Sequence, residues 1–325
     1  MSAFKTILAF GFAVGAQLFS GVSAYAQAYP SKQIRIVVPF VAGGAIDALA
    51  RIVGAKMQES MNVPIIVENR PGAGGNVGTE VVAKSAPDGT TILLNSNGQA
   101  ISPATFKSLS WDPVRDFIPV TQLVATNLVL VASNETPARN LKEFVALAKS
   151  KPGVLNYGST GIGNPLHLTM ELLKLRAGIE IQMVSYRSDG EILNALMGNF
   201  VQAAIVPIAS GKAQIEQGTV RGLAVTGAQR AKGLDLPTVG EQGVADFAIG
   251  GWQGFFVPAK TPPDIVDRIY RETKKALDMP DVQQRLDSFA NVPVGSTPAE
   301  FEKFYLSELA SFKSLVAAAK IPLQE

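Results

Sequence analysis

The chain has 325 residues, a formal net charge of +2, 47% hydrophobic residues and no cysteine. So small a net charge argues against nucleic-acid binding, for which a strongly basic patch would be expected. The absence of cysteine excludes disulfides, so a hydrophobic core must stabilise the fold, and a chain of this length can form one large or two ordinary domains.

The first 26 residues have the pattern of a secretory signal peptide. Lys5 is their only charged residue, residues 7–14 are apolar, and Ala24-Tyr-Ala26 places small side chains at the positions that determine cleavage. We expect cleavage before Gln27, which takes the net charge from +2 to +1 because only Lys5 is lost. An N-terminal membrane anchor is the alternative, although glycine and polar residues interrupt the apolar run, which is short for a span. Because no cysteine is present to carry a lipid, we expect a soluble, extracytoplasmic protein.

A strand, a glycine-rich loop, a helix and a second strand follow the signal. Residues 34–40 form a β-type run that breaks into Val41-Ala-Gly-Gly-Ala-Ile-Asp47. Apolar residues then recur at helical spacing over 49–57, and a second β-type run covers 65–70. This order is typical of a βαβ unit, whose loop presents backbone N–H groups at the positive end of a helix.

The same order occurs a second time. Residues 154–157 form a β-type run, residues 158–164 a glycine-rich loop, and a helix is expected over 165–176 before another β-type run at 181–186. Asn164-Pro165 supplies an N-cap and a first helical residue together. Two such loops in separate halves of a secreted chain predict two lobes that close on one small anion.

The rest of the chain continues the alternation of strands and helices. A strand at 92–94 leads into a predicted polar loop, Asn95-Ser-Asn-Gly98, and residues 121–132 form a β-rich stretch longer than one strand. Asn140 and Glu143 form a capping box that predicts a helix to Lys149. Further strands are expected at 201–206, 220–225 and 252–258, and helices at 77–84, 191–198, from 264 and from 298. This alternation predicts an α/β fold with largely parallel sheets.

Motifs for catalysis are missing from the sequence. His167 is the single histidine, so a two-histidine metal site cannot form. A Ser-His-Asp set would need His167, and no G-x-S-x-G elbow surrounds any serine. The run Gly72–Gly78 lacks both the G-x-G-x-x-G spacing and the lysine of a phosphate loop. We therefore expect no catalytic residue, no metal and no cofactor, and we interpret His167 as a packing or hydrogen-bonding residue.

Longer motifs run through the whole mature chain in a fixed order. They are Tyr29-Pro-Ser-Lys, Ile36-Val-Val-Pro-Phe, Val67-Glu-Asn-Arg-Pro-Gly-Ala-Gly-Gly-Asn76, Ala86-Pro-Asp-Gly89, Asp112-Pro-Val-Arg-Asp-Phe117, Leu155-Asn-Tyr-Gly-Ser159, Gly222-Leu-Ala-Val-Thr226, Pro237-Thr-Val239 and Pro293-Val-Gly-Ser-Thr-Pro298. With these motifs the chain resembles the Bug family, the TctC-type solute-binding proteins of tripartite tricarboxylate transporters.

The resemblance implies a periplasmic, two-lobed Venus flytrap of the type II binding-protein kind, each lobe a mostly parallel sheet flanked by helices. Residues 121–132 and 252–258 would cross between the lobes. Residues 27–124 plus 254–325 would then form lobe 1, and residues 125–253 lobe 2.

The family holds a small carboxylate, amino acid or aromatic acid between the lobes through loop backbone, hydroxyl groups and ordered water. The resemblance and the two loops together predict ligand contacts from both lobes. In lobe 1 these are Phe40, Gly43, Gly44, Ala45, Ile46, Asp47, Asn95, Ser96 and Asn97. In lobe 2 they are Ser159, Thr160, Gly161, Gly163, Asn164, His167, Tyr186, Arg187 and Pro207.

The chain departs from the family pattern at three places. Ile46 stands where the family has a hydroxyl, and Tyr186-Arg-Ser-Asp189 replaces Tyr-Lys-Gly-Gly. Asp189 either complements the helix dipole or, if it faces the cleft, repels a second carboxylate and attracts an amine. Gln202-Ala-Ala-Ile-Val-Pro207 lacks two acids and an amide of the family strand. These changes favour a monocarboxylate, an amide or a more apolar ligand.

The expected partners follow from the resemblance. The family delivers its ligand to a large and a small membrane subunit driven by an ion gradient. Docking on a membrane sensor kinase is an alternative role, and an enzyme in the cleft is an alternative of another class. We expect a monomer.

Overall fold

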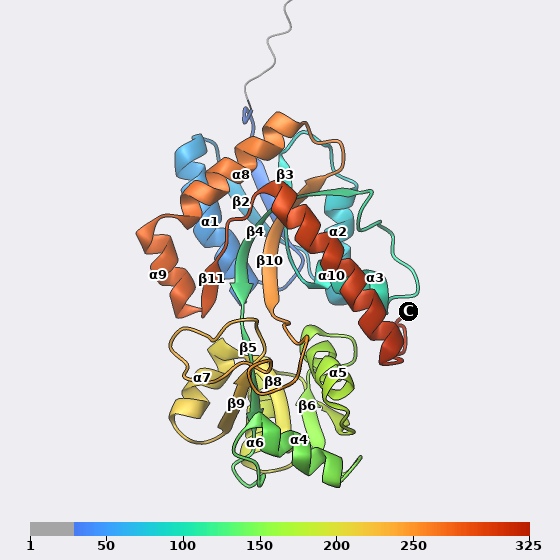
Figure 1. Cartoon of the computed structure of the whole chain (residues 1–325). Helices are drawn as coiled ribbons and strands as arrows, with labels where there is room; N and C mark the ends of the chain where they lie inside the picture. Colours follow the sequence, from blue (N-terminus) through green and yellow to red (C-terminus); the bar gives the residue numbers. More distant parts are fainter. Residues whose placement is uncertain (1–28) are drawn as a thin grey trace, which may run out of the picture.

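The computed structural model describes residues 29–325, which form two lobes stacked end to end (Figure 1). The predicted signal peptide, residues 1–26, lies outside the described residues. Each lobe is built on one sheet with helices on both faces. Within residues 29–325, no helix has both the length and the apolar character needed to cross a bilayer.

Lobe 1 contains a six-stranded sheet of order β11-β4-β10-β3-β1-β2. Its strands are β1 Ile34–Val38, β2 Ile65–Asn69, β3 Thr91–Ser96, β4 Phe117–Thr126, β10 Gly251–Pro258 and β11 Asn291–Pro293. One face is covered by α1 Ala45–Met61, α8 Pro263–Leu277 and α9 Pro280–Ser288. The other is covered by α2 Asn76–Ala83, α3 Gly98–Thr105 and α10 Pro298–Ala318, with the short helix η1 Ala73–Gly75 before α2.

Lobe 2 contains a five-stranded sheet of order β7-β6-β8-β5-β9. Its strands are β5 Leu128–Ala132, β6 Asn156–Ser159, β7 Gln182–Ser185, β8 Ala203–Pro207 and β9 Arg221–Val225. The helices α4 Leu141–Ser150 and α5 Pro165–Ala177 cover one face, and α6 Asp189–Met197 and α7 Ile208–Glu216 cover the other. β5 is buried along its whole length because apolar helices pack on both of its sides.

Both sheets are mixed, so their parallel share is smaller than the sequence predicted. β1 is parallel to β2 and β3, and β6 is parallel to β7 and β8. β10 and β11 in lobe 1 and β5 in lobe 2 pair only antiparallel. The reason is the connection between lobes. β5 and β10 start at the junction, so they run opposite to the strands that end there.

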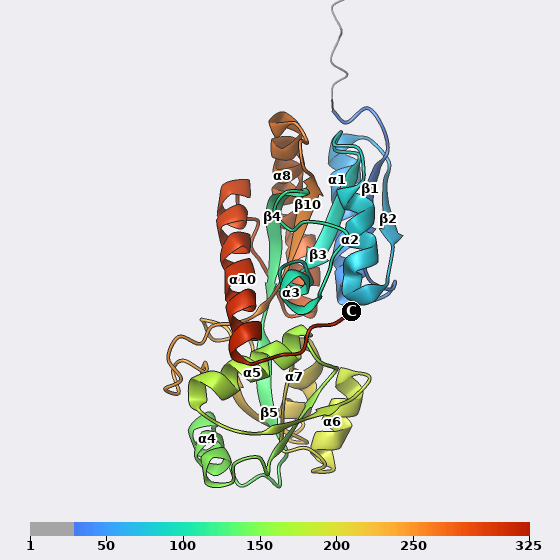
Figure 2. The ribbon, with the colours of Figure 1, turned by 90° about the vertical axis from the view of Figure 1, so that its right-hand side faces the viewer.

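Strand register places the carboxyl ends of the parallel strands at this junction. Ser96, which ends β3, pairs with Gln253 near the start of β10. Pro207, which ends β8, pairs with Leu128, the first residue of β5. β4 leads directly into β5, and β10 starts beside the end of β4. The carboxyl ends of β3 and β8 therefore lie where the two lobes meet (Figures 1 and 2). Ligands of open α/β sheets bind outside such ends.

Helix starts follow the capping residues of the sequence. Asn140 accepts from the N–H of Glu143, and Asn164 accepts from the N–H of His167 with Pro165 as the first helical residue. Thr297 and Glu300 form a complete capping box at the start of α10. The polar run after β3, predicted as a loop, instead ends that strand and starts α3.

Candidate ligand-binding site

The loop between β1 and α1 is closed by the side chain of Asp47. Asp47 Oδ2 accepts the backbone N–H of Gly43 at 3.0 Å, and Arg51 donates to both carboxylate oxygens at 3.0 Å. Asn69, which ends β2, donates to Asp47 Oδ1 at 3.0 Å and to the carbonyl of Phe40 at 3.1 Å. The hydrogen bond from Arg51 is the largest cause of a lowered pKa for this buried carboxyl. Asp47, predicted as a ligand contact, is thus used within lobe 1 as a brace.

The same loop presents backbone donors to the junction. Residues 41–45 are exposed, and Gly44 is the N-cap of α1 without a side-chain cap. The N–H groups of Ala45 and Ile46 have no acceptor among residues 29–325, as is usual for the first turn of a helix. A Cβ on Gly44 would meet only the carbonyl of Val41 at 3.9 Å. The Ile46 side chain is half-buried against the core beneath α1, so it closes the loop from below.

Asn95, Ser96 and Asn97 lie beside this loop at the end of β3. Asn95 is buried, donates to Thr79 Oγ1 at 3.1 Å and to Gln99 Oε1 at 2.7 Å, and accepts from the N–H of Ser96. Its amide is therefore fully engaged inside lobe 1. Ser96 is half-buried, and Asn97 is the N-cap of α3. The Ser96 hydroxyl accepts the N–H of Gly98 at 3.4 Å, and the Asn97 side-chain amide makes no hydrogen bond within residues 29–325.

The loop between β6 and α5 is the counterpart in lobe 2. Asn164 donates to Thr160 Oγ1 at 3.0 Å and to the carbonyl of Gly161 at 2.8 Å. Gly161 and Gly163 have φ angles of +126° and +78°, which side chains rarely adopt, so glycine is required there. Within the described part of the chain, the N–H groups of Gly161 and Ile162 have no acceptor. This loop also offers backbone donors to the junction.

His167 closes the lobe 2 loop, and its buried ring is engaged in a hydrogen bond within that loop. Its Nδ1 accepts the N–H of Gly163 at 3.1 Å, so the neutral ring carries its proton on Nε2. Nε2 lies 3.8 Å from Glu171 Oε1, which also accepts from Tyr157 at 2.7 Å and Lys174 at 2.6 Å. Burial lowers the pKa of His167, in agreement with its interpretation as a hydrogen-bonding residue.

The other predicted residues of lobe 2 lie on the same edge. Ser159 ends β6 beside Ser185 of β7, and the N–H of Tyr186 donates to its carbonyl at 2.9 Å. The Ser159 hydroxyl is buried and has no partner among residues 29–325. Arg187 is exposed, and its guanidinium makes no ion pair with any described residue. Pro207 starts α7 at the end of β8.

Asp189 lies at the start of α6, next to these residues. It is half-buried, and its only side-chain contact in the described range is with Ser210 Oγ at 3.4 Å. Burial raises the pKa of this carboxyl, and the hydrogen bond from Ser210 opposes that rise. A carboxylate without a cationic partner disfavours a second negative charge nearby.

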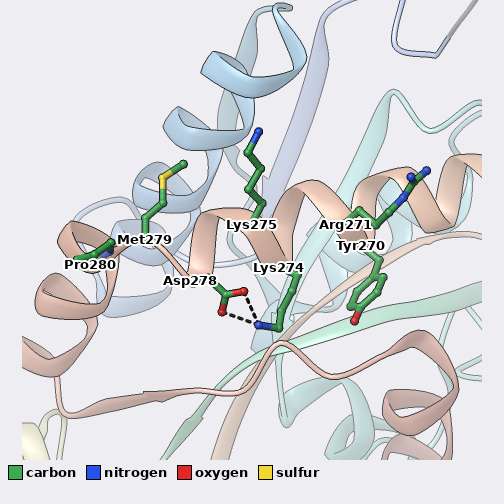
Figure 3. Close-up of a pocket in the computed structure, with 7 residues that line it drawn as sticks. All are labelled: Tyr270, Arg271, Lys274, Lys275, Asp278, Met279 and Pro280. Carbon is green, nitrogen blue, oxygen red and sulfur yellow. Dashed lines mark hydrogen bonds and ion pairs between the residues drawn. The ribbon is translucent and has the colours of Figure 1, made fainter.

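Two hollows lie outside the junction loops, and none of the predicted residues lines either of them. Figure 3 shows one of about 550 Å³, formed by α8 and the start of α9, in which Lys274 pairs with Asp278. Another, of about 600 Å³, lies between α5 of lobe 2 and α10 of lobe 1. No group of three or more metal-binding side chains occurs within residues 29–325. The candidate site is the set of two loops and neighbouring strand ends at the junction of the lobes.

Sequence reasoning missed the residues that hold these loops in place. They are Arg51 and Asn69 around Asp47, Thr79 and Gln99 around Asn95, Ser210 beside Asp189, and Gln324, whose side chain reaches Ile162. Of these, only the contact of Arg51 was predictable from the sequence, because Arg51 follows Asp47 by four residues and so lies on the same helix face.

Comparison with known proteins identifies the family. A model described as "Tripartite tricarboxylate transporter family receptor", TctC, matches residues 49–321. The chain belongs to this family. A relative from Pseudomonas sp. (strain P51), "UPF0065 protein in tcbD-tcbE intergenic region", is 34% identical over 296 residues, which cover 90% of this chain and 88% of the relative.

Solved structures agree with the fold of this TctC-family receptor. A structure described as a periplasmic transporter is 34% identical, with a TM-score of 0.77 and coverage of 91% of this chain and 100% of its own. A Rhodopseudomonas palustris protein with adipate is 29% identical at a TM-score of 0.77, with coverage of 91% and 100%. MatC from the same organism, with bound malate, is 29% identical at a TM-score of 0.73, with coverage of 89% and 100%.

These matches confirm several predictions from the sequence. The Bug-type resemblance, the two-lobed binding-protein fold and the periplasmic location are confirmed. The chain is a TctC-family solute-binding receptor, and the family consists of receptors that are not enzymes.

Proposed function

We propose that this TctC-family receptor captures a small carboxylate between the 43–46 loop of lobe 1 and the 160–164 loop of lobe 2. The observation that carries the proposal is the pair of unsatisfied donor sets, one on each loop, at the junction of the lobes. Backbone N–H groups at a helix N-terminus bind a carboxylate without a fixed cation. A ligand that contacts both loops favours the arrangement in which they lie close together.

Two residues of the chain, Ile46 and Asp189, limit which carboxylates can bind. The relatives solved with adipate and malate support a carboxylate. Ile46 supplies no hydroxyl at the first loop, and no cationic side chain of residues 29–325 pairs with Asp189, so a second carboxylate would meet repulsion. We therefore propose a ligand with one carboxylate and an uncharged, amide or amine-bearing remainder.

The remaining parts of the proposal concern domains and partners. Lobe boundaries at 124/125 and 253/254 fall inside β4 and β10, and a register shift between Gln253 and Gly254 supports a hinge there. The closed receptor, as a monomer, would deliver its ligand to the large and small membrane subunits of a tripartite tricarboxylate-type transporter. The family match supports such partners.

A thermal-shift panel tests the ligand class. Ligand-stripped protein is measured against matched pairs such as hexanoate and adipate, together with amides, amino acids and aromatic acids. A ligand at about 100 times its dissociation constant adds roughly 2.7 kcal/mol to stability, which gives a clear rise in Tm. We expect a single class of monocarboxylates to raise Tm, whereas no shift with any carboxylate would refute the proposal.

A further inference from the structure

The segment after α10, residues 321–325, crosses from lobe 1 to the ligand loop of lobe 2. We name these residues the strap. Gln324 pairs with the end of α3, since its N–H donates to the carbonyl of Thr105 at 2.7 Å and its carbonyl accepts from Lys107 at 2.9 Å. In Figure 2 the strap leaves α10 and runs between α3 and lobe 2. Two backbone hydrogen bonds therefore fix Gln324 to lobe 1.

The side chain of Gln324 contacts the lobe 2 loop directly. Its Nε2 donates to the carbonyl of Ile162 at 3.3 Å. The next residue, Gly163, permits this approach, because a Cβ there would lie 2.7 Å from Gln324 Nε2 and 3.4 Å from Thr105. The other hydrogen bonds of the loop, those of Asn164 and His167, stay within lobe 2. Ile162 is thus the loop residue that hydrogen-bonds to lobe 1.

We propose that Gln324 is a positioning residue for ligand capture, which holds the 160–164 loop against lobe 1 and so favours the closed arrangement of the lobes. α3 links the strap to the predicted ligand site of lobe 1. It starts beside the predicted ligand residue Asn97 and ends at the residues that bind the strap. A hydrogen bond between lobes forms only while they are close at that point, so its loss shifts the population toward separated lobes. The proposal rests on the proposed function for its effect on binding, but not for its effect on lobe separation.

The test measures lobe separation in the ligand-free protein. Because the chain has no cysteine, Lys142→Cys on α4 and Lys275→Cys on α8, both exposed and in different lobes, give unique sites for a fluorescent donor and acceptor. Gln324→Glu keeps the shape of the side chain but removes the donor to Ile162. Glu325→Gln, which removes only an exposed ion pair with Lys107, is the matched control in the strap.

We expect Gln324→Glu to lower energy transfer at pH 7, with an unchanged Tm, and Glu325→Gln to leave both unchanged. A glutamate with a pKa of about 4.3 is more than half protonated near pH 4 and donates again, so the variant should there regain the energy transfer of its parent. A purely structural role for residue 324 would not produce this pH profile. Energy transfer equal to that of the parent at pH 7 would overturn the proposal.

Binding of the strongest compound from the carboxylate panel gives the second readout. Loss of one net hydrogen bond should weaken it roughly three- to tenfold in Gln324→Glu, mainly through faster dissociation. An unchanged affinity, despite lower energy transfer, would also overturn the positioning role. If no compound binds even the parent, the proposed function fails, while the energy-transfer experiment still decides the role of Gln324.

Discussion

Asp47 of lobe 1 and His167 of lobe 2 hold the same position and make the same contact. Each is the third residue of its helix, α1 or α5, and each accepts the N–H of the glycine four residues earlier. The distances are 3.0 Å from Gly43 to Asp47 Oδ2 and 3.1 Å from Gly163 to His167 Nδ1. One loop is closed by a carboxylate and the other by a neutral imidazole, so the two braces should respond differently to pH.

Removing the carboxylate brace should destabilise lobe 1. Asp47→Ala leaves Gly43, Arg51 and Asn69 without their common acceptor, and we expect a loss of about 2–3 kcal/mol in the free energy of unfolding. Asp267→Ala is the matched control, because Asp267 also pairs with an arginine four residues on, at 3.0 Å, but is 57% exposed. Asp267→Ala should lower the free energy of unfolding by less than about 0.5 kcal/mol. Urea denaturation measures both, and equal losses would contradict the bracing role.

The same brace predicts a pH dependence. The pKa of Asp47 is lowered in the folded state, chiefly by Arg51, so its stabilisation is present above the unfolded pKa of about 3.9. It is lost as pH falls through the lower folded pKa. The stability difference between the parent and Asp47→Asn should therefore shrink in acid, and a difference that grows below pH 4 would be inconsistent with this assignment.

The imidazole brace should take up a proton less readily than a histidine of the unfolded chain. Burial lowers the pKa of His167, so the unfolded chain takes up its proton first, and stability falls as pH decreases from about 6.5 toward the folded pKa. His167→Gln should flatten that part of the profile. Since His167 is the single histidine, its nitrogen NMR signals are unambiguous in protein without a histidine tag. We expect the folded ring to be less than half protonated at pH 6.5, with the proton of the neutral form on Nε2, and a mostly protonated imidazolium at that pH would contradict the hydrogen bond from Gly163.

The charge on Asp189 should select against dicarboxylates. Burial raises the pKa of this carboxyl, so the parent loses stability as pH rises from about 3.9 to the folded pKa, and Asp189→Asn should not. The variant should also improve the affinity for adipate relative to hexanoate by roughly tenfold, because a like-charge repulsion on the order of 1.4 kcal/mol is removed. Calorimetric titration gives the ratio, and an unchanged ratio would place Asp189 outside the ligand's reach.

The sequence predicted the elements whose signals are local. Asn164-Pro165 located α5, and Asn140 located α4, because capping residues act within one helical turn. α3 was missed because Gly98 and Pro103 oppose a helix, and packing against α10 overrides that preference. The contact between Gln324 and Ile162 joins residues 162 positions apart, and only the fold brings them together. The equivalence of Asp47 and His167 was hidden for a similar reason, since one is a charged acceptor and the other a neutral one.

The first turn of α1 is the proposed carboxylate site of lobe 1. Gly44→Val adds a side chain over that turn with modest effect on the fold, because a Cβ there meets only the Val41 carbonyl at 3.9 Å. Gly240→Val is the matched control in an exposed loop of lobe 2, where a Cβ would also find its nearest neighbour at 3.8 Å.

Calorimetric titration of the parent, Gly44→Val and Gly240→Val with the strongest carboxylate of the thermal-shift panel tests this site. We predict that Gly44→Val loses measurable binding while its Tm stays close to that of the parent, and that Gly240→Val binds as the parent does. Parent-like affinity in Gly44→Val would show that the carboxylate does not bind at the α1 loop.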